Sequence, residues 1–229
     1  MRDLIIKIAL KIGIYKRLVK IDTYFKEKRM AKNFLRYGKE TLIQADNAIR
    51  SCNAKMILNF GTLLGFYRDG GFIPYDFDLD VCMLASERPD NLREIMSDFG
   101  FSLKRQFYEK ATNIITEEQF VYKGVQIDFF YLYEKEHDWY AFSARRHETK
   151  DWKEANRTDG FPSVIWPCKK CNIIEKEYIG HTFFVPELEK DWLSGVYGED
   201  FMTPVKNWTE KGRETRMIRN TNRLYRASL

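Results

Sequence analysis

The chain has 229 residues, of which 44% are hydrophobic and 15% aromatic, and its formal net charge at pH 7 is +5. This apolar content is enough for a folded core, so intrinsically disordered, collagen-like and low-complexity chains are excluded. No uncharged apolar run approaches the ~20 residues that a membrane-spanning helix needs. Because Lys7 and Lys11 interrupt the apolar stretch near the start, we expect a cytoplasmic protein without a cleavable signal peptide.

The positive charge is concentrated at the two ends of the chain. Residues 1–33 have a net charge of +7 and residues 205–229 of +5, so residues 34–204 have a net charge of −7. A nucleic-acid-binding domain would have positive charge across its folded surface, so we expect no nucleic-acid partner. The charge pattern predicts a basic N-terminal extension, an acidic central domain and a basic C-terminal tail, divided at these same boundaries.

The N-terminal extension has the periodicity of an amphipathic helix. Its apolar stripe has spacings of three and four residues and consists of Ile5, Ile8, Ile12, Tyr15 and Val19. Basic side chains flank the stripe, so their stems can cover apolar surface while their charges reach phosphate headgroups. Two arrangements remain open. The helix binds an anionic membrane, making the protein peripheral on the inner face, or it packs on its own domain.

The central domain alternates short helices and strands. Helices are predicted at 37–53, 62–69, 88–100 and from near Pro186, and strands at 55–61, 77–83, in succession between 101 and 145, and at 181–187. The polar segment 145–170 lacks periodicity and is interpreted as a loop that covers a site. A mixture of strands and helices without a regular βαβ order predicts an α+β fold.

The cysteines do not indicate a disulfide framework. Cys52 and Cys82 lie in apolar stretches and are interpreted as core residues, whereas Cys168 and Cys171 form a C-x-x-C pair. A zinc site would need two further ligands. Metal binding by this pair and two thiols in a reducing compartment both remain open.

Three aspartates, Asp76, Asp78 and Asp80, alternate with apolar residues. In a strand Asp78 and Asp80 share a face, with Asp76 entering from the preceding loop. Two like charges about 4 Å apart repel by about 4 kcal/mol at an effective dielectric of 20, so we expect a cation among them. Asp128, isolated in the apolar strand 125–133, needs a partner of the same kind. Carboxylates at this density favour Mg²⁺ or Mn²⁺ over zinc.

Gly61 and Thr62 lie between the first predicted strand and the following helix. The glycine allows a phosphate to approach the backbone, and Thr62 can cap the helix and present its hydroxyl. A phosphate cradle 16–18 residues before a D-x-D strand resembles the nucleotidyltransferase superfamily, typified by polymerase-β-like enzymes. The strand that contains Asp128 resembles the third acidic piece of that superfamily.

A narrower resemblance covers about residues 40–205. FGTLLGFYRDGGFIPYDFDLDV at 60–81 resembles the signature of the LicD/fukutin-related family, with Tyr75 in place of the usual tryptophan, and VYGEDFMTP at 196–204 is similar to a second family element. The usual F-P-L before the penultimate strand is Trp-Pro-Cys at 166–168. The basic ends lie outside the resemblance.

The resemblance implies a LicD-type phosphotransferase with a nucleotidyltransferase mixed sheet flanked by helices in residues 34–204. Such enzymes transfer phosphocholine, ribitol phosphate or a similar phospho-alcohol from a CDP-activated donor to a hydroxyl of a cell-surface glycan or glycolipid, releasing CMP. Their products include lipopolysaccharide, capsule and teichoic acid. The resemblance implies that Asp78, Asp80 and Asp128 bind Mg²⁺ and that Arg68 binds phosphate or fixes the acidic loop. Either Asp128 or Asp76 accepts the acceptor's proton, and Asp76 is favoured as the base or as a support of the metal site.

Two other functions remain open. A nucleotidyltransferase that moves a nucleotide from an NTP onto RNA or a small molecule would use the same aspartates and release pyrophosphate. A non-catalytic adaptor attached through its basic ends would bind no donor, although an intact carboxylate cluster is costly without a cation.

Overall fold

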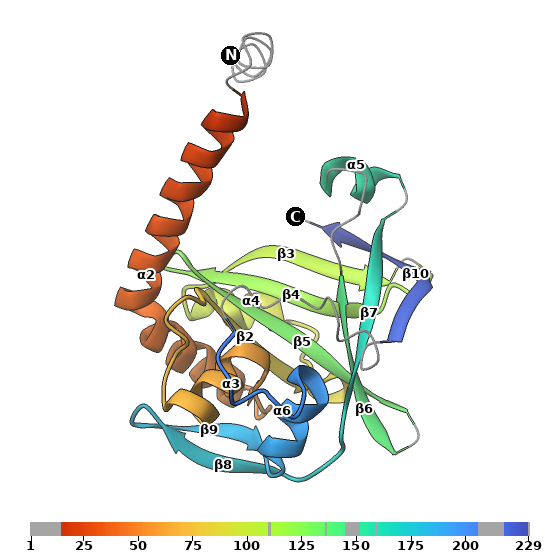
Figure 1. Ribbon diagram of the computed structural model, residues 1–229. Coiled ribbons are helices and arrows are strands. Elements are labelled where there is room, and N and C mark those ends of the chain that lie inside the picture. The colour runs from red at the N-terminus through yellow and green to blue at the C-terminus, as the bar shows by residue number, and fades with distance from the viewer. Residues whose placement is uncertain are drawn as a thin grey trace.

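The computed structural model describes residues 15–109, 111–135, 137–144, 152–158, 160–205 and 218–228. Within these residues the strands form one ten-stranded mixed sheet in the order β4-β3-β10-β7-β6-β5-β2-β1-β9-β8. A further pairing of β4 with β5 closes the strands from β4 to β5 into a ring. Figure 1 shows the sheet with helices packed around it. The expected α+β fold is confirmed.

The described helices and strands have the following bounds. The helices are α2 (Tyr15–Ser51), α3 (Phe60–Asp69), α4 (Leu92–Asp98), α5 (Trp152–Arg157) and α6 (Glu189–Tyr197), with a 3-10 helix η1 (Ala85–Glu87). The strands are β1 (Ile57–Leu58), β2 (Asp78–Leu84), β3 (Ser102–Glu109), β4 (Ile115–Tyr122), β5 (Val125–Lys135), β6 (Asp138–Ala144), β7 (Phe161–Cys168), β8 (Ile173–Tyr178), β9 (His181–Pro186) and β10 (Ile218–Ser228).

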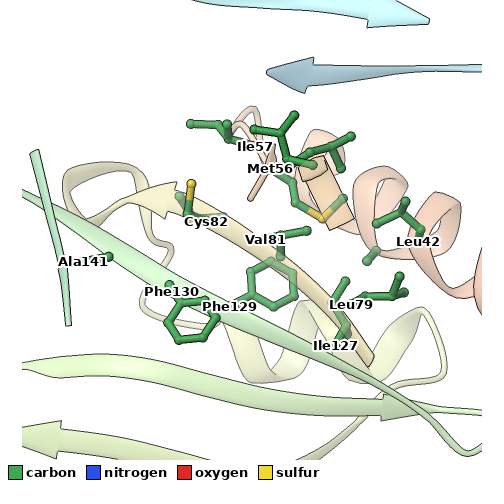
Figure 2. Packing of buried hydrophobic residues seen from close by; sticks show 14 of the residues in the cluster. Leu42, Met56, Ile57, Leu79, Val81, Cys82, Ile127, Phe129, Phe130 and Ala141 are labelled. Carbon is green, nitrogen blue, oxygen red and sulfur yellow. The ribbon is translucent and has the colours of Figure 1, made fainter. Parts of the chain in front are cut away.

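The parallel pair β2 and β5 forms the centre of the hydrophobic core. Leu79 and Val81 on β2 and Ile127 and Phe129 on β5 are fully buried. These side chains gather beside α2, where Leu42 contributes to the same cluster (Figure 2). Because side chains alternate along a strand, burial of this face directs the intervening residues of β2 and β5 to the opposite face.

Helix α2 is continuous, whereas the sequence predicts separate helices at 1–22 and 37–53. Residues 23–36 contain no glycine or proline and several strong helix formers, so nothing interrupts the helix between the two predicted segments. The N-terminal half of α2 extends away from the sheet in Figure 1. Residues 1–14 of the predicted extension lie outside the described residues. None of the described helices combines the length and apolarity needed to cross a membrane.

The C-terminal part of the chain contributes to the sheet and is not only a tail. Residues 218–228 form β10, which pairs antiparallel with β3 on one side and β7 on the other. The segment 145–170, expected to be a covering loop, contains α5 and β7. The sequence did not predict β7 because it contains Pro162 and Pro167. Proline lacks a backbone N–H donor and normally argues against a strand inside a sheet.

We expect Phe129→Ala to lower the free energy of unfolding by about 3–5 kcal/mol, because it leaves a cavity in the core. The ring is fully buried and lies edge-to-face against Phe120, with centroids 5.7 Å apart. As a control, Leu35→Ala on α2, where the side chain is 85% exposed, should change the value by less than about 0.5 kcal/mol. Urea denaturation measures both, and equal losses would contradict this description of the core.

Candidate active site

Hydrogen bonds attach the first turn of α3 to Asp80 on β2. The Asn59 N–H donates to the backbone oxygen of Asp80 at 3.2 Å, and the Gly61 N–H donates to Asp80 Oδ2 at 3.1 Å. The Asp80 N–H donates to Thr62 Oγ1 at 2.8 Å. The backbone and carboxylate of Asp80 are therefore both fixed relative to α3.

Thr62 has a different role from the one that the sequence suggested. It does not cap α3, because the N-cap position is Asn59, which makes no side-chain cap hydrogen bond. The Thr62 side chain is buried, and its hydroxyl accepts the hydrogen bond from β2. Thr62 therefore positions the acidic strand.

Gly61 is needed because two carboxylates approach its backbone. A Cβ at this position would lie 2.4 Å from Asp76 Oδ2 and 3.2 Å from Asp80 Oδ2. Much of the space that the sequence analysis assigned to a phosphate thus contains carboxylate oxygens. The preceding residue, Phe60, has a φ of +38°, a backbone conformation that costs free energy in a non-glycine residue and is concentrated at functional sites.

The carboxylates of Asp76, Asp78 and Asp80 gather on the face of β2 opposite the core. Removal from water, followed by a hydrogen bond and the charge of Asp78, raises the pKa of Asp76 to about 8. A hydrogen bond between two carboxyl groups requires a proton on one of them. Desolvation and then the charges of Asp78, Asp128 and Asp76 raise the pKa of Asp80 well above its ordinary value. The site therefore concentrates negative charge that water solvates poorly.

Asp128 lies directly beside Asp80, since the parallel register of β2 and β5 pairs these two residues. Paired residues on neighbouring strands are about 4.8 Å apart. Both Asp128 oxygens accept hydrogen bonds from Gln126 Nε2, at 2.8 and 3.0 Å. Desolvation, then the charges of Glu117 and Asp78, raises the pKa of Asp128 well above its ordinary value. The neighbouring-strand position expected for Asp128 is therefore the one that the structure shows.

Glu117 on β4 is a site residue that the sequence analysis missed. It is buried, and its Oε1 accepts a 2.7 Å hydrogen bond from Gln119, which is paired with Asp128 in the β4–β5 register. Its chain neighbours Thr116, Glu118 and Gln119 are polar. No clear signal in the sequence therefore indicated that its side chain is buried beside the aspartates. Glu117 adds a further carboxylate beside Asp128.

The arrangement of the four predicted aspartates bears on whether they can bind a metal ion. Across the described ranges, no three His, Cys, Asp or Glu side chains form a ready set of ligands, and the Asp128 oxygens are engaged by Gln126. The donor chemistry nevertheless fits a hard cation, because carboxylate oxygens are crowded on one face and desolvation and mutual repulsion oppose the ionised state. A divalent ion bound there would offset this repulsion.

Arg68, at the end of α3, lies against the acidic loop. Its Nε and Nη2 donate to the two carboxylate oxygens of Asp69 at 2.9 and 2.8 Å. Hydrogen bonding to Asp69 is the largest cause of the raised pKa of Arg68, and Tyr75 contributes as well. Since Tyr75 directly precedes Asp76, Arg68 contacts the loop that delivers this carboxylate.

A cavity of about 420 Å³ adjoins the carboxylates. Of the predicted site residues, Gly61, Arg68, Asp76 and Asp80 line it, and Asp78 and Asp128 adjoin this wall on β2 and β5. The volume lies in the range of small-molecule sites, which combine apolar walls with a few polar groups. The arrangement can therefore accept a ligand of nucleotide or sugar size next to the acidic cluster.

Aromatic rings form much of the remaining wall. Phe60 meets Phe130 and Trp166 edge-to-face, with centroids 4.9 and 5.7 Å away. Trp166 Nε1 donates to Ser143 Oγ at 3.2 Å, which fixes the indole. Trp166 belongs to the Trp-Pro-Cys departure from the family pattern. That departure therefore alters a wall of the cavity.

Helix α6 closes the cavity on another side. Trp192 Nε1 donates to Asn59 Oδ1 at 2.9 Å, which ties α6 to the start of α3. Tyr197, at the end of α6, lines the cavity. Burial, then the charges of Asp80 and Asp76, raises the pKa of Tyr197 well above its ordinary value. The late sequence element at 196–204 is thus brought next to the acidic strand.

The C-x-x-C segment lies outside this cavity wall. Cys168 is buried in β7, and burial raises the pKa of its thiol to about 12. Between the cysteines, Lys169 pairs with Asp191 at 2.9 Å and Lys170 pairs with Glu134. The two lysines between the cysteines therefore form ion pairs at the protein surface.

Comparison with known proteins identifies the family. A family model described as "LicD/FKTN/FKRP, nucleotidyltransferase domain" matches residues 53–177, more than half of the chain. The chain belongs to this family. The match confirms the resemblance seen in the sequence, and it covers α3, β2 and β5, the elements that contain Gly61 and the aspartates.

The chain also matches individual proteins over part of their length. The protein is 26% identical over 180 residues to "Ribitol-5-phosphate transferase FKTN" of Mus musculus and 25% identical over 179 residues to the Homo sapiens protein of the same name, in each case 78% of the chain. It spans only 36% of the length of these relatives. An uncharacterized Caenorhabditis elegans protein, T07A5.1, is 41% identical over 54 residues, 22% of this chain and 14% of that protein.

We expect Thr62→Val to lower the free energy of unfolding by about 1–3 kcal/mol, because it leaves the Asp80 N–H without its acceptor. Thr62→Ser keeps the hydroxyl and removes only a methyl group, so it should cost about 1 kcal/mol or less. Chemical denaturation of the two variants measures the difference. If valine proved as well tolerated as serine, the hydrogen bond to β2 would not position Asp80.

Proposed function

We propose that this chain is a Mg²⁺-dependent (or Mn²⁺-dependent) transferase that moves a phospho-alcohol from a CDP-activated donor to a hydroxyl of a glycan or glycolipid. The observation that supports this most is the carboxylate cluster beside the 420 Å³ cavity, in a chain of the LicD/FKTN/FKRP family. Because the Mus musculus and Homo sapiens relatives are named ribitol-5-phosphate transferases, ribitol phosphate is the group that we propose first.

The reaction is a displacement at phosphorus. The acceptor oxygen forms a bond to the phosphorus that bears the alcohol, the bond from that phosphorus to the CMP oxygen breaks, and CMP leaves. The acceptor proton passes to a carboxylate. We assign this base to Asp76, which lines the cavity at the end of the loop 70–77 and can therefore meet the acceptor hydroxyl.

Asp78, Asp80 and Asp128 are the residues that would bind the ion. When bound, a divalent cation neutralises charge on the diphosphate as the leaving group departs. Gly61 allows the carboxylates close to the first turn of α3, and Arg68 provides a positive charge on the cavity wall for a donor phosphate. The aromatic wall of Phe60, Phe130 and Trp166 excludes water from the same space.

We expect Asp78→Asn and Asp80→Asn each to lower the rate of CMP release at least about 100-fold, because the site loses a charge needed in the transition state. The assay supplies CDP-ribitol, CDP-glycerol or CDP-choline with Mg²⁺ and a glycan acceptor. Asp98→Asn, a change of the same kind at an exposed position on α4, should leave the rate unchanged.

The products separate the proposed function from its alternative. Release of pyrophosphate from an NTP, with no CMP from any CDP-alcohol, would show nucleotidyl transfer instead. Full activity in both the Asp78 and the Asp80 variant would contradict the assignment of the site itself.

We expect Asp80→Asn to be at least as stable as the wild type in metal-free buffer near pH 8. A carboxyl group whose pKa is raised by folding destabilises the folded state at pH above its ordinary pKa, and asparagine removes that cost. Mg²⁺ at 100 times its dissociation constant should stabilise the wild type by about 2.7 kcal/mol and the variant much less. Thermal unfolding with Mg²⁺ or EDTA measures both, and an equal Mg²⁺ response would exclude Asp80 as a ligand.

A further inference from the structure

The N-terminal two-thirds of α2 exposes large apolar side chains. Ile21, Tyr24, Phe25 and Leu35 are 52%, 57%, 63% and 85% exposed. The N-terminal end of the helix extends away from the sheet in Figure 1, whereas its C-terminal end packs against β2 and β5. A group of large exposed apolar residues marks a contact surface.

These four residues lie on one side of the helix. At about 100° per residue they fall within an arc of about 100°. The same side, widened to about 140°, also presents exposed basic residues, which are Arg17, Lys28, Arg29, Lys32, Arg36 and Lys39. By helical position, every residue from 17 to 39 on this side is hydrophobic or basic. We call the four apolar and six basic residues named here the basic-apolar face.

The acidic residues between positions 17 and 39 lie outside the basic-apolar face. Asp22 and Glu27 lie outside the arc by helical position, and Asp22 pairs with Lys26 at 2.6 Å, one turn along. On the face itself, Lys28 Nζ lies 5.8 Å from the centroid of the Tyr24 ring, and the Tyr24 ring meets Phe25 edge-to-face. Cationic groups and aromatic rings are therefore interleaved, and within residues 17–39 no carboxylate falls inside the arc.

The combination of basic and apolar side chains on one face favours some binding partners over others. A helix that only faces water usually alternates positive and negative charges. A nucleic acid would use the cations but not Ile21, Phe25 and Leu35. The surface of an anionic bilayer uses both, because acyl chains receive the apolar groups while lysine and arginine stems extend to the phosphates.

We propose that the basic-apolar face of α2 binds the surface of an anionic lipid bilayer. The helix lies along the membrane, with Tyr24 and Phe25 at the boundary between headgroups and acyl chains and the basic groups at lipid phosphates. The proposal depends on α2 alone and is independent of the reaction proposed for the cavity.

Vesicle flotation of the full chain tests the proposal, with vesicles of phosphatidylcholine alone or in an equimolar mixture with phosphatidylglycerol. We expect binding to the mixture to be at least about tenfold tighter and to weaken as salt screens the charges. Lys28→Gln with Lys32→Gln should weaken it about 25-fold, since each basic group near an anionic surface contributes about fivefold. Phe25→Ser should weaken binding about tenfold or more.

Matched controls lie off the face. Lys26→Gln with Lys55→Gln changes the net charge equally, and Met30→Ser alters an exposed apolar residue on the far side of the helix. Both should bind almost as the wild type does. Equal losses in the control and face variants, or no preference for the anionic vesicles, would overturn the proposal. So would sedimentation showing a dimer that Phe25→Ser dissociates, without vesicle binding, because the face would then join two copies of the chain.

Discussion

Crowding of negative charge on one face of β2 and β5 is the constraint on which the site depends. The parallel register places Asp80 beside Asp128, and the loop before β2 brings Asp76 against Asp78. Burial alone would drive these groups to their protonated forms. The fold keeps them together because the opposite face of the same strands, with Leu79, Val81, Ile127 and Phe129, contributes to the core.

The carboxylates can crowd together because α3, the acidic loop and β2 approach one another closely. Gly61 admits two carboxylates to the first turn of α3, and the Thr62 hydroxyl holds the Asp80 backbone there. At Gly65, one turn on, a Cβ would lie 2.6 Å from the Gly71 oxygen, so the acidic loop packs directly on α3. Gly61, which the sequence assigned to a phosphate cradle, thus serves first to place the carboxylates, and Gly65 lets the acidic loop pack on the helix.

Local patterns predicted the site better than they predicted the sheet around it. The period-two alternation at 77–83 and the isolated Asp128 placed the carboxylates on neighbouring strands, since side-chain direction follows directly from strand periodicity. Contacts between residues that are far apart in the sequence produce no local pattern of this kind. The Thr62 hydrogen bond to Asp80, the insertion of β10 between β3 and β7, and β7 with its two prolines all depend on tertiary contacts.

Helix α2 links the two surfaces on which function is proposed. Its C-terminal half, with Leu42 and Ile49 fully buried, packs behind the strands that present the aspartates. Residues 17–39 of the helix present the basic-apolar face. Because α2 is one continuous helix from Tyr15 to Ser51, its two parts keep a fixed relative orientation. A bilayer bound by that face would therefore hold the cavity at a fixed angle to the membrane, which favours an acceptor that is itself attached to lipid.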